Sequence, residues 1–283
     1  MPARIAHPES IVETAWVAEH LNDDTLALVE VDVDTEAYAQ GHIAGAIGWN
    51  WTTQLNNTLR RDALSREEMQ RLLGQSGITR RTNIVLYGDN NNWFATYAFW
   101  QIKMYGHKGL KVMNGGRQKW IDEGRELTTK VPNPTPRTYR APNPDPSIRA
   151  TRDYMLELAW TDNNVGLVDV RAPAEYSGEL LAPANLPQEG SQRGGHIPGA
   201  ANVPWASAVN ERDGTFKSVE ELREIYGGKG ITGDKEVVAY CRIGERSSHT
   251  WFVLSQILGY SKVRNYDGSW TEYGSIVGAP IER

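Results

Sequence analysis

The sequence is almost without cysteine, since Cys241 is the only one among 283 residues. One thiol excludes an internal disulfide, a CxxC redox pair and a cysteine-rich zinc site. The six histidines include no pair at the i,i+4 spacing of many helical metal sites. No metal is therefore expected, and any chemistry at Cys241 has to proceed without a second thiol from the same chain.

Excess positive charge and long apolar runs are also missing. The net charge is -5 and the sequence shows no basic stripe, so nucleic acid is not an expected partner. No stretch approaches the roughly 18 apolar residues of a membrane span, and the first ten residues contain no signal-peptide core. We expect a cytoplasmic globular protein that does not enter a membrane, and a monomer is compatible with this composition.

The sequence repeats itself once. "GHIAGAIGWNW" from Gly41 is paralleled by "GHIPGAANVPW" from Gly195, and "IVLYG" ending at Gly88 by "VVAYC" ending at Cys241. "LVEVD" and "LVDVR" form another pair, as do "KVMNGGRQKW" and "KVRNYDGSW". The order of motifs is the same in both halves, so we interpret the chain as a duplicated domain.

A proline-rich segment separates the two copies. Prolines stand at positions 132, 134, 136, 142, 144 and 146, a density that prevents helix and central strand and favours an extended connector. We predict a first domain over residues 1–145, including this connector from about residue 131, and a second domain over residues 146–283.

Each copy alternates short β-rich runs with helical runs. This alternation predicts right-handed crossovers and two α/β domains, each a small, mostly parallel sheet flanked by helices. Ser10 and Glu13 have the spacing of a capping box, which predicts a helix over residues 11–22.

The copies differ in chemistry at one strand-to-helix loop. Cys241 follows the run "VVAY", whereas Gly88 occupies the matching position in the first copy and Asp89 lies opposite Arg242. Ligands of α/β sheets bind at the carboxyl ends of strands, and Cys241 is predicted to lie there. We therefore interpret Cys241 as a catalytic nucleophile, with a buried core cysteine as the alternative.

The loop after Cys241 is expected to favour a thiolate. Backbone amides at a helix start, together with Arg242 and Arg246, place positive charge around the sulfur, and Gly244 allows an unusual backbone conformation. These effects predict a lowered pKa for Cys241 without a separate general base. Glu245 is expected to face solvent or to pair with an arginine, and His249 to be structural.

Together, "CRIGERS", the two "GHI" turns, "DVR" and "NYDGSW" resemble the rhodanese family, and most closely its two-domain bacterial thiosulfate sulfurtransferases. The resemblance covers nearly the whole chain and implies two tandem rhodanese-like domains, the first inactive and the second catalytic. It implies that Cys241 takes sulfur from thiosulfate, releases sulfite, and passes the persulfide sulfur to cyanide or a thiol. A small-molecule donor and acceptor are implied, and no cofactor besides the covalent persulfide.

The resemblance also assigns substrate-binding residues. The loop supplies Arg242, Ile243, Gly244, Glu245, Arg246 and Ser247. Aromatic residues of the first domain, Trp93 and Phe94, correspond to a wall of the site, with packing in the helix core as the alternative. The chain departs from mitochondrial relatives at Ile243, where they have lysine, and at Glu175, where they have a substrate-binding arginine. Arg193 is a candidate replacement for that arginine, with a solvated loop charge as the alternative.

Three other functions remain as alternatives. A 3-mercaptopyruvate sulfurtransferase typically has a less charged loop than "CRIGERS". A phosphatase loop of related folds places five residues between cysteine and arginine, whereas only four separate Cys241 from Arg246 here. A non-catalytic sulfur carrier or binding module would need no turnover. Rhodanese-like domains without a cysteine exist, and the first copy resembles one.

Overall fold

The computed structural model describes residues 3–160, 164–182 and 190–283. The chain divides into two compact units. The unit that we call N-terminal comprises His7–Asp145 and Val209–Phe216, and the C-terminal unit comprises Pro146–Ala208, Lys217–Arg283 and the short stretch before His7. Within the described residues, no helix is both long and apolar enough to cross a membrane.

The N-terminal unit contains a five-stranded parallel sheet with the order β1-β5-β4-β2-β3. Its strands are β1 (Ile11–Val12), β2 (Leu26–Glu30), β3 (Ile47–Gly48), β4 (Asn83–Tyr87) and β5 (Leu110–Met113). The helices are α1 (Thr14–Glu19), α2 (Ala37–Gln40), α3 (Trp51–Gln54), α4 (Arg66–Gln75), α5 (Asp89–Met104) and α6 (Gly116–Asp122), with a 3-10 turn at Pro8–Ser10.

The C-terminal unit contains a second five-stranded parallel sheet with the order β6-β10-β9-β7-β8. Its strands are β6 (Arg149–Ala150), β7 (Val165–Asp169), β8 (Ala201–Asn202), β9 (Glu236–Tyr240) and β10 (Val263–Tyr266). The helices are α7 (Arg152–Trp160), α8 (Pro173–Ser177), α9 (Val219–Gly227), α10 (Glu245–Phe252), the π-helix Val253–Ile257 and α11 (Ser269–Tyr273), with 3-10 turns at Pro146–Ile148 and Trp205–Ala208.

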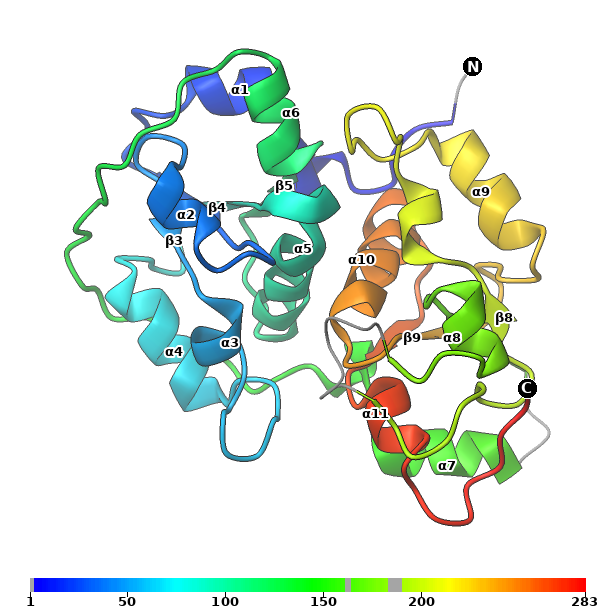
Figure 1. The fold of residues 1–283 in the computed structure, drawn as a ribbon. Helices are drawn as coiled ribbons and strands as arrows, with labels where there is room; N and C mark the ends of the chain where they lie inside the picture. Colours follow the sequence, from blue (N-terminus) through cyan, green and yellow to red (C-terminus); the bar gives the residue numbers. More distant parts are fainter. Residues whose placement is uncertain (1–2, 161–163, 183–189) are drawn as a thin grey trace. The chain divides into compact units, whose positions relative to one another are not determined.

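The two sheets have the same topology, which confirms the predicted α/β class and the duplication. In each unit the helix after the central strand packs on that strand and its neighbour, α5 on β4 and β5 (Figure 1), and α10 on β9 and β10. The strands are apolar because helices cover the sheets. Buried core residues include Val85 and Tyr87 in one unit and Val238 and Tyr240 in the other.

The two "GHI" turns are structural in both units. His42 stacks on Tyr38 with ring centroids 3.9 Å apart, and His196 stacks on Tyr176 at 3.6 Å. Each tyrosine hydroxyl donates to a backbone carbonyl in the same turn, at 2.7 Å in both copies. Both histidines therefore have a structural role within their turns.

The expected capping box at Ser10 and Glu13 is wrong. Ser10 ends a 3-10 turn, and Ile11 and Val12 form β1, which pairs with β5 through Ile11 and Val112. Helix α1 begins only at Thr14. The β-branched pair Ile11–Val12 suits an edge strand, and pairing with β5 satisfies its backbone in place of a helix.

The proline-rich segment packs along the N-terminal unit. The Arg137 amide donates to the Gly74 carbonyl at 2.8 Å, and the Ala141 amide donates to Gln70 Oε1 at 3.0 Å. Tyr139 is buried, and its hydroxyl lies 2.9 Å from Nδ1 of His107. The connector therefore has specific partners in the unit that precedes it.

Candidate active site

Cys241 directly follows β9, at the carboxyl end of a central strand, and the loop after it leads into α10. The side chain is fully buried. The adjacent strand of the sheet, β7, ends at the same level, because Asp169 pairs with Tyr240. Cys241 thus occupies the edge of the sheet at which parallel α/β folds bind ligands.

The backbone of the cysteine loop is held by residues of the "NYDGSW" motif. The Cys241 amide donates to Ser269 Oγ at 3.0 Å, and this hydroxyl donates to the Tyr266 carbonyl at 2.6 Å. The amide of Trp270 donates to the Cys241 carbonyl at 3.0 Å, and the amide of Thr271 donates to the Arg242 carbonyl at the same distance. The start of α11 therefore fixes the start of the loop.

The turn at Gly244 depends on glycine. Gly244 has φ +96°, and a Cβ there would lie 2.4 Å from the Cα of Asp267. Its carbonyl accepts from Asn265 Nδ2 at 2.9 Å, and Ser247 Oγ donates to Asn265 Oδ1 at 2.6 Å. The unusual backbone expected at Gly244 is confirmed, and Asn265 couples both sides of the turn.

The sulfur of Cys241 has two close polar neighbours. The Gly244 amide donates to Sγ at 3.1 Å, and Sγ lies 3.5 Å from Glu245 Oε2, a geometry in which a thiol donates to the carboxylate. Burial and the charge of Glu245 raise the pKa of Cys241, against the charge of Arg246 and the hydrogen bonds of Ser247, which lower it. The lowered pKa expected from the sequence is wrong, because desolvation and an adjacent carboxylate both oppose the thiolate.

The positive charges of Arg242 and Arg246 are each balanced by a nearby carboxylate. Arg242 Nη2 lies 3.6 Å from Glu245 Oε1, and both side chains are almost completely buried. Arg246 donates two hydrogen bonds to the Glu175 carboxylate, at 2.9 and 3.0 Å. Of the two roles expected for Glu245, the pairing with an arginine is confirmed and exposure to solvent is wrong.

Glu175 has a role that the sequence did not reveal. The carboxylate sits at the third residue of α8, buried, and also accepts from the Ala172 amide at 3.1 Å. Burial raises the pKa of Glu175, but the hydrogen bonds and charge of Arg246 outweigh this effect and leave the pKa lowered. The departure from the family pattern at Glu175 thus provides the partner of Arg246.

The buried "DVR" arginine is also paired. Arg171 donates to the Asp169 carboxylate at 2.6 Å and to the Gly195 carbonyl at 2.6 Å. Its guanidinium lies over the ring of Trp270, 4.7 Å from the centroid. Arg171 thereby connects β7, the second "GHI" turn and α11 behind the loop.

The predicted site residues outside the loop have other contacts. Arg193 donates to the backbone carbonyls of Tyr273, Gly274, Ile276 and Ala279, so it fastens the C-terminal segment and is not a solvated loop charge. Within the cysteine loop, Ile243 is half-buried, whereas the other residues from 241 to 247 are buried. His249 is buried against Trp205, with ring centroids 5.2 Å apart, and burial lowers its pKa to about 3.

Trp93 and Phe94 lie at the start of α5 in the N-terminal unit. Phe94 is buried and stacks on Trp51 with ring centroids 4.2 Å apart, and the Trp93 ring is parallel to it at 5.7 Å. Three consecutive residues before them, Asn90 to Asn92, have positive φ. The two aromatic side chains thus belong to a stacked cluster, and their contact with substrate stays a prediction.

Gly88, the position in the N-terminal unit that corresponds to Cys241, has no room for a side chain. A Cβ on Gly88 would lie 2.1 Å from the Val31 carbonyl oxygen. The Gly88 amide donates to Asn92 Oδ1 at 3.0 Å, and the following Asp89 carboxylate accepts from the Val33 amide at 2.6 Å. The loop of this unit is therefore organised around different hydrogen bonds.

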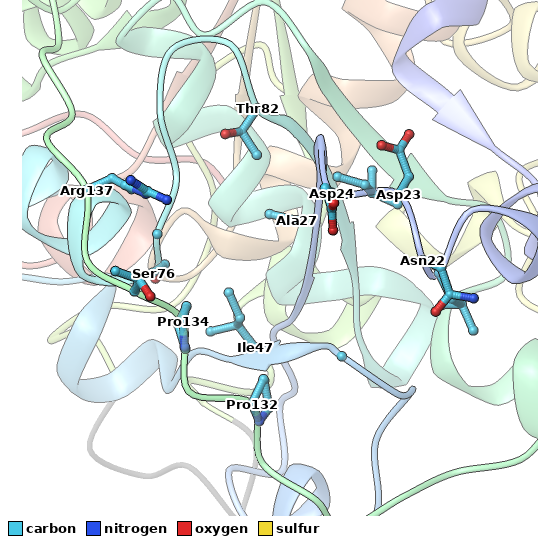
Figure 2. A pocket seen from close by; sticks show the side chains of 15 residues that line it. Asn22, Asp23, Asp24, Ala27, Ile47, Ser76, Thr82, Pro132, Pro134 and Arg137 are labelled. Carbon is cyan, nitrogen blue, oxygen red and sulfur yellow. The ribbon is translucent and has the colours of Figure 1, made fainter.

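A pocket of about 740 Å³ lies elsewhere in the N-terminal unit. Figure 2 shows side chains such as Asp23, Asp24, Thr82 and Arg137 around it. Asp24 and Thr82 precede β2 and β4, so the pocket is at the amino ends of these strands, opposite to the edge at which α/β sheets bind ligands. Among the described residues, no cluster of three or more histidine, cysteine or acidic side chains could hold a metal ion.

Comparisons with known proteins agree along the whole chain. A family model described as a rhodanese-like domain matches residues 13–123 and 151–275. A Saccharopolyspora erythraea protein named "Putative thiosulfate sulfurtransferase" is 54% identical over 278 residues, 98% of each chain. A Thermus thermophilus protein named "Sulfur carrier protein TtuD" is 55% identical over 280 residues, again 98% of each chain. A solved structure of EanB, described with a cysteine persulfide and ergothioneine, has a TM-score of 0.85 and 26% identity, covering 99% of this chain and 72% of that one.

Proposed function

This chain belongs to the rhodanese family, and from that premise we propose that it is a thiosulfate sulfurtransferase that carries sulfur as a persulfide on Cys241. The acceptor is cyanide in an assay and a thiol in the cell. Because reducing compartments keep a lone thiol reduced, we place this activity in the cytoplasm.

The observation that carries the proposal is the Gly244 amide pointing at the Cys241 sulfur from 3.1 Å, within a turn that only glycine can make. A backbone donor aimed at this position stabilises negative charge on sulfur when the thiol ionises. Relatives of the same length are named for thiosulfate sulfur transfer and for carrying sulfur. The EanB structure is described with a persulfide on one of its cysteines, which supports the same intermediate here.

The reaction has two half-reactions. The Cys241 thiol first loses its proton, and the thiolate forms a bond to the outer sulfur of thiosulfate. The sulfur–sulfur bond of thiosulfate breaks, its electron pair leaves with sulfite, and the enzyme keeps a persulfide. A nucleophilic acceptor then takes the terminal sulfur, and the bonding electron pair returns to Sγ of Cys241, which regains its proton.

A sulfur carrier is the second candidate, favoured by the name of the Thermus thermophilus relative. The two functions share the persulfide and differ in what removes the sulfur. Transfer to cyanide or small thiols at a catalytic rate supports the enzyme, whereas stable loading with transfer only to a protein acceptor supports the carrier. Since both loop arginines are paired with carboxylates, thiosulfate and 3-mercaptopyruvate should be compared directly as donors.

The proposal is tested by replacing the nucleophile. Cys241→Ala should abolish both the one-sulfur adduct that thiosulfate produces on the protein and the formation of thiocyanate from cyanide. Mass spectrometry of the intact protein measures the first and a colorimetric assay the second. Activity retained in this variant would reject the proposal, and a large preference for 3-mercaptopyruvate over thiosulfate would reject the assigned donor.

A further inference from the structure

Glu245 is an unusual neighbour for a nucleophilic sulfur. Its side chain is buried, and Oε2 lies 3.5 Å from Sγ of Cys241. The other oxygen, Oε1, is buried, accepts no hydrogen bond and lies 3.6 Å from Nη2 of Arg242. The Glu245 carboxylate therefore lies between the sulfur of Cys241 and Arg242, one of the cations that were expected to lower the pKa of the thiol.

The distance between Sγ and Oε2 suits a thiol better than a thiolate. A thiol donates its proton to the carboxylate, whereas a thiolate would place two negative charges side by side away from water. Two sets of neutral donors oppose this effect: the Gly244 amide, which donates to the sulfur from 3.1 Å, and the hydrogen bonds of Ser247. These donors are neutral groups, whereas the carboxylate carries a full negative charge and the site is buried, so the contacts together favour the protonated sulfur.

Other charged groups around the loop are already paired. On α10, Arg246 is held by Glu175 of α8, and His249 is uncharged near neutral pH because burial lowers its pKa to about 3. Further pairs join Asp169 with Arg171 at the end of β7 and Asp267 with Arg149 beside Gly244. Among the charges near the sulfur, Glu245 acts most strongly on the pKa of Cys241, ahead of the opposing charge of Arg246.

We propose that Glu245 sets the protonation state of the nucleophile: its carboxylate accepts the hydrogen bond of the Cys241 thiol and keeps the resting sulfur protonated. Sulfur loading then depends on loss of this proton and accelerates as the pH rises. The same charge faces the anionic persulfide, which favours passing sulfur on over storing it. The statements on loading and persulfide rest on the proposed function, whereas the hydrogen bond and its effect on ionisation do not.

The direct test is a titration of the thiol. Because Cys241 is the only cysteine, the ultraviolet absorbance of its thiolate is obtained by subtracting the Cys241→Ser variant at each pH. Glu245→Gln removes the charge but keeps the size of the side chain. The midpoint should move about one pH unit or more toward acid, which means roughly tenfold more thiolate at neutral pH.

Three further variants separate charge from structure. Glu245→Asp keeps a carboxylate and should titrate closer to the wild type than Glu245→Gln does. Arg242→Gln removes the cation beside the carboxylate and should move the midpoint toward alkali. Glu224→Gln makes the same chemical change on the exposed face of α9 and should leave the titration unchanged.

An unchanged or alkaline midpoint in Glu245→Gln would overturn the inference. If that variant does not fold, an acid shift or no shift in Arg242→Gln would overturn it. Loading with thiosulfate, followed by mass spectrometry over the same pH range, separates the two proposals. A shifted titration without loading would reject thiosulfate transfer alone, whereas loading with an unshifted titration would reject the role of Glu245 alone.

Discussion

At the scale of single residues, the site is built from buried ion pairs. Arg246 and Glu175 are both almost completely buried and joined by two hydrogen bonds. A buried pair is costly to assemble, but removal of one partner leaves a charge without compensation. Glu175 is therefore expected to be required for stability as well as for the electrostatics of the loop.

Glu175→Ala should lower the free energy of unfolding by about 3 kcal/mol at neutral pH, because Arg246 is left buried without its carboxylate. Denaturant unfolding followed by circular dichroism measures this loss. The exposed substitution Glu224→Ala serves as the control and should change stability by less than about 0.5 kcal/mol. Equal effects of the two substitutions would contradict the importance of the pair.

The pair also predicts a pH dependence. The pKa of Glu175 is lower in the folded state than in the unfolded chain. Its contribution is therefore fully present above the unfolded pKa, ordinarily about 4.3, and is lost as the pH falls through the folded pKa. The stability difference between the wild type and Glu175→Gln should shrink in this acidic range. A difference that stays constant down to low pH would contradict the assignment.

At the scale of elements, the cysteine loop is held by a second loop. The segment 265–270, from the end of β10 into α11, supplies the hydroxyl of Ser269, the amide of Trp270 and the side chain of Asn265. Asp267 in the same segment leaves no space for a Cβ on Gly244. The position of the sulfur therefore depends on the contact of two strand-to-helix connections, not on the cysteine loop alone.

Gly244→Ala should misplace the amide that faces Sγ and reduce sulfur transfer roughly a hundredfold, as small displacements in active sites do. The matched control is Gly278→Ala, which has a similar left-handed φ of +83° but open space around its Cβ. The rate of thiocyanate formation is the measurement. Similar losses in both variants would show that backbone strain, and not the contact with Asp267, explains the effect.

At the scale of the whole molecule, the chain is a duplication in which only one copy has a cysteine after its central strand. The sheets have the same strand order, and Gly88 follows β4 as Cys241 follows β9. Yet Gly88 is packed against the Val31 carbonyl, and Asp89 is held by backbone amides. The loop after β4 therefore packs differently from the cysteine loop after β9. The two copies differ in the structure of this loop, and not only in the residue at the position of Cys241.

Gly88→Cys, made in the Cys241→Ser background, should therefore not restore sulfur loading. The new side chain collides with backbone, so the free energy of unfolding should fall by roughly 1–3 kcal/mol, the usual cost of overpacking. Mass spectrometry after thiosulfate treatment and denaturant unfolding give the two results. A persulfide on the introduced cysteine would contradict this interpretation.

The duplication, the two α/β domains and the position of Cys241 after a central strand could be predicted from the sequence because they follow from local patterns. Strand and helix runs, the "GHI" turns and a glycine in a tight loop are each encoded within a few neighbouring residues. The misplaced helix start at Ser10 shows the limit of such patterns. Pairing of Ile11 with β5, about 100 positions away in the chain, decided the local structure there.

Only the tertiary structure decided the electrostatics of the site. Arg246 and Glu175 are 71 residues apart in the sequence, and their pairing removes a charge that the loop alone would offer to a substrate. Glu245 was expected at the surface or beside an arginine, but burial brings it against both Arg242 and the sulfur. The sequence alone predicted which atom is the nucleophile. Its ionisation depends on desolvation and on charges from separate elements, because the energy of a buried charge is set by everything around it.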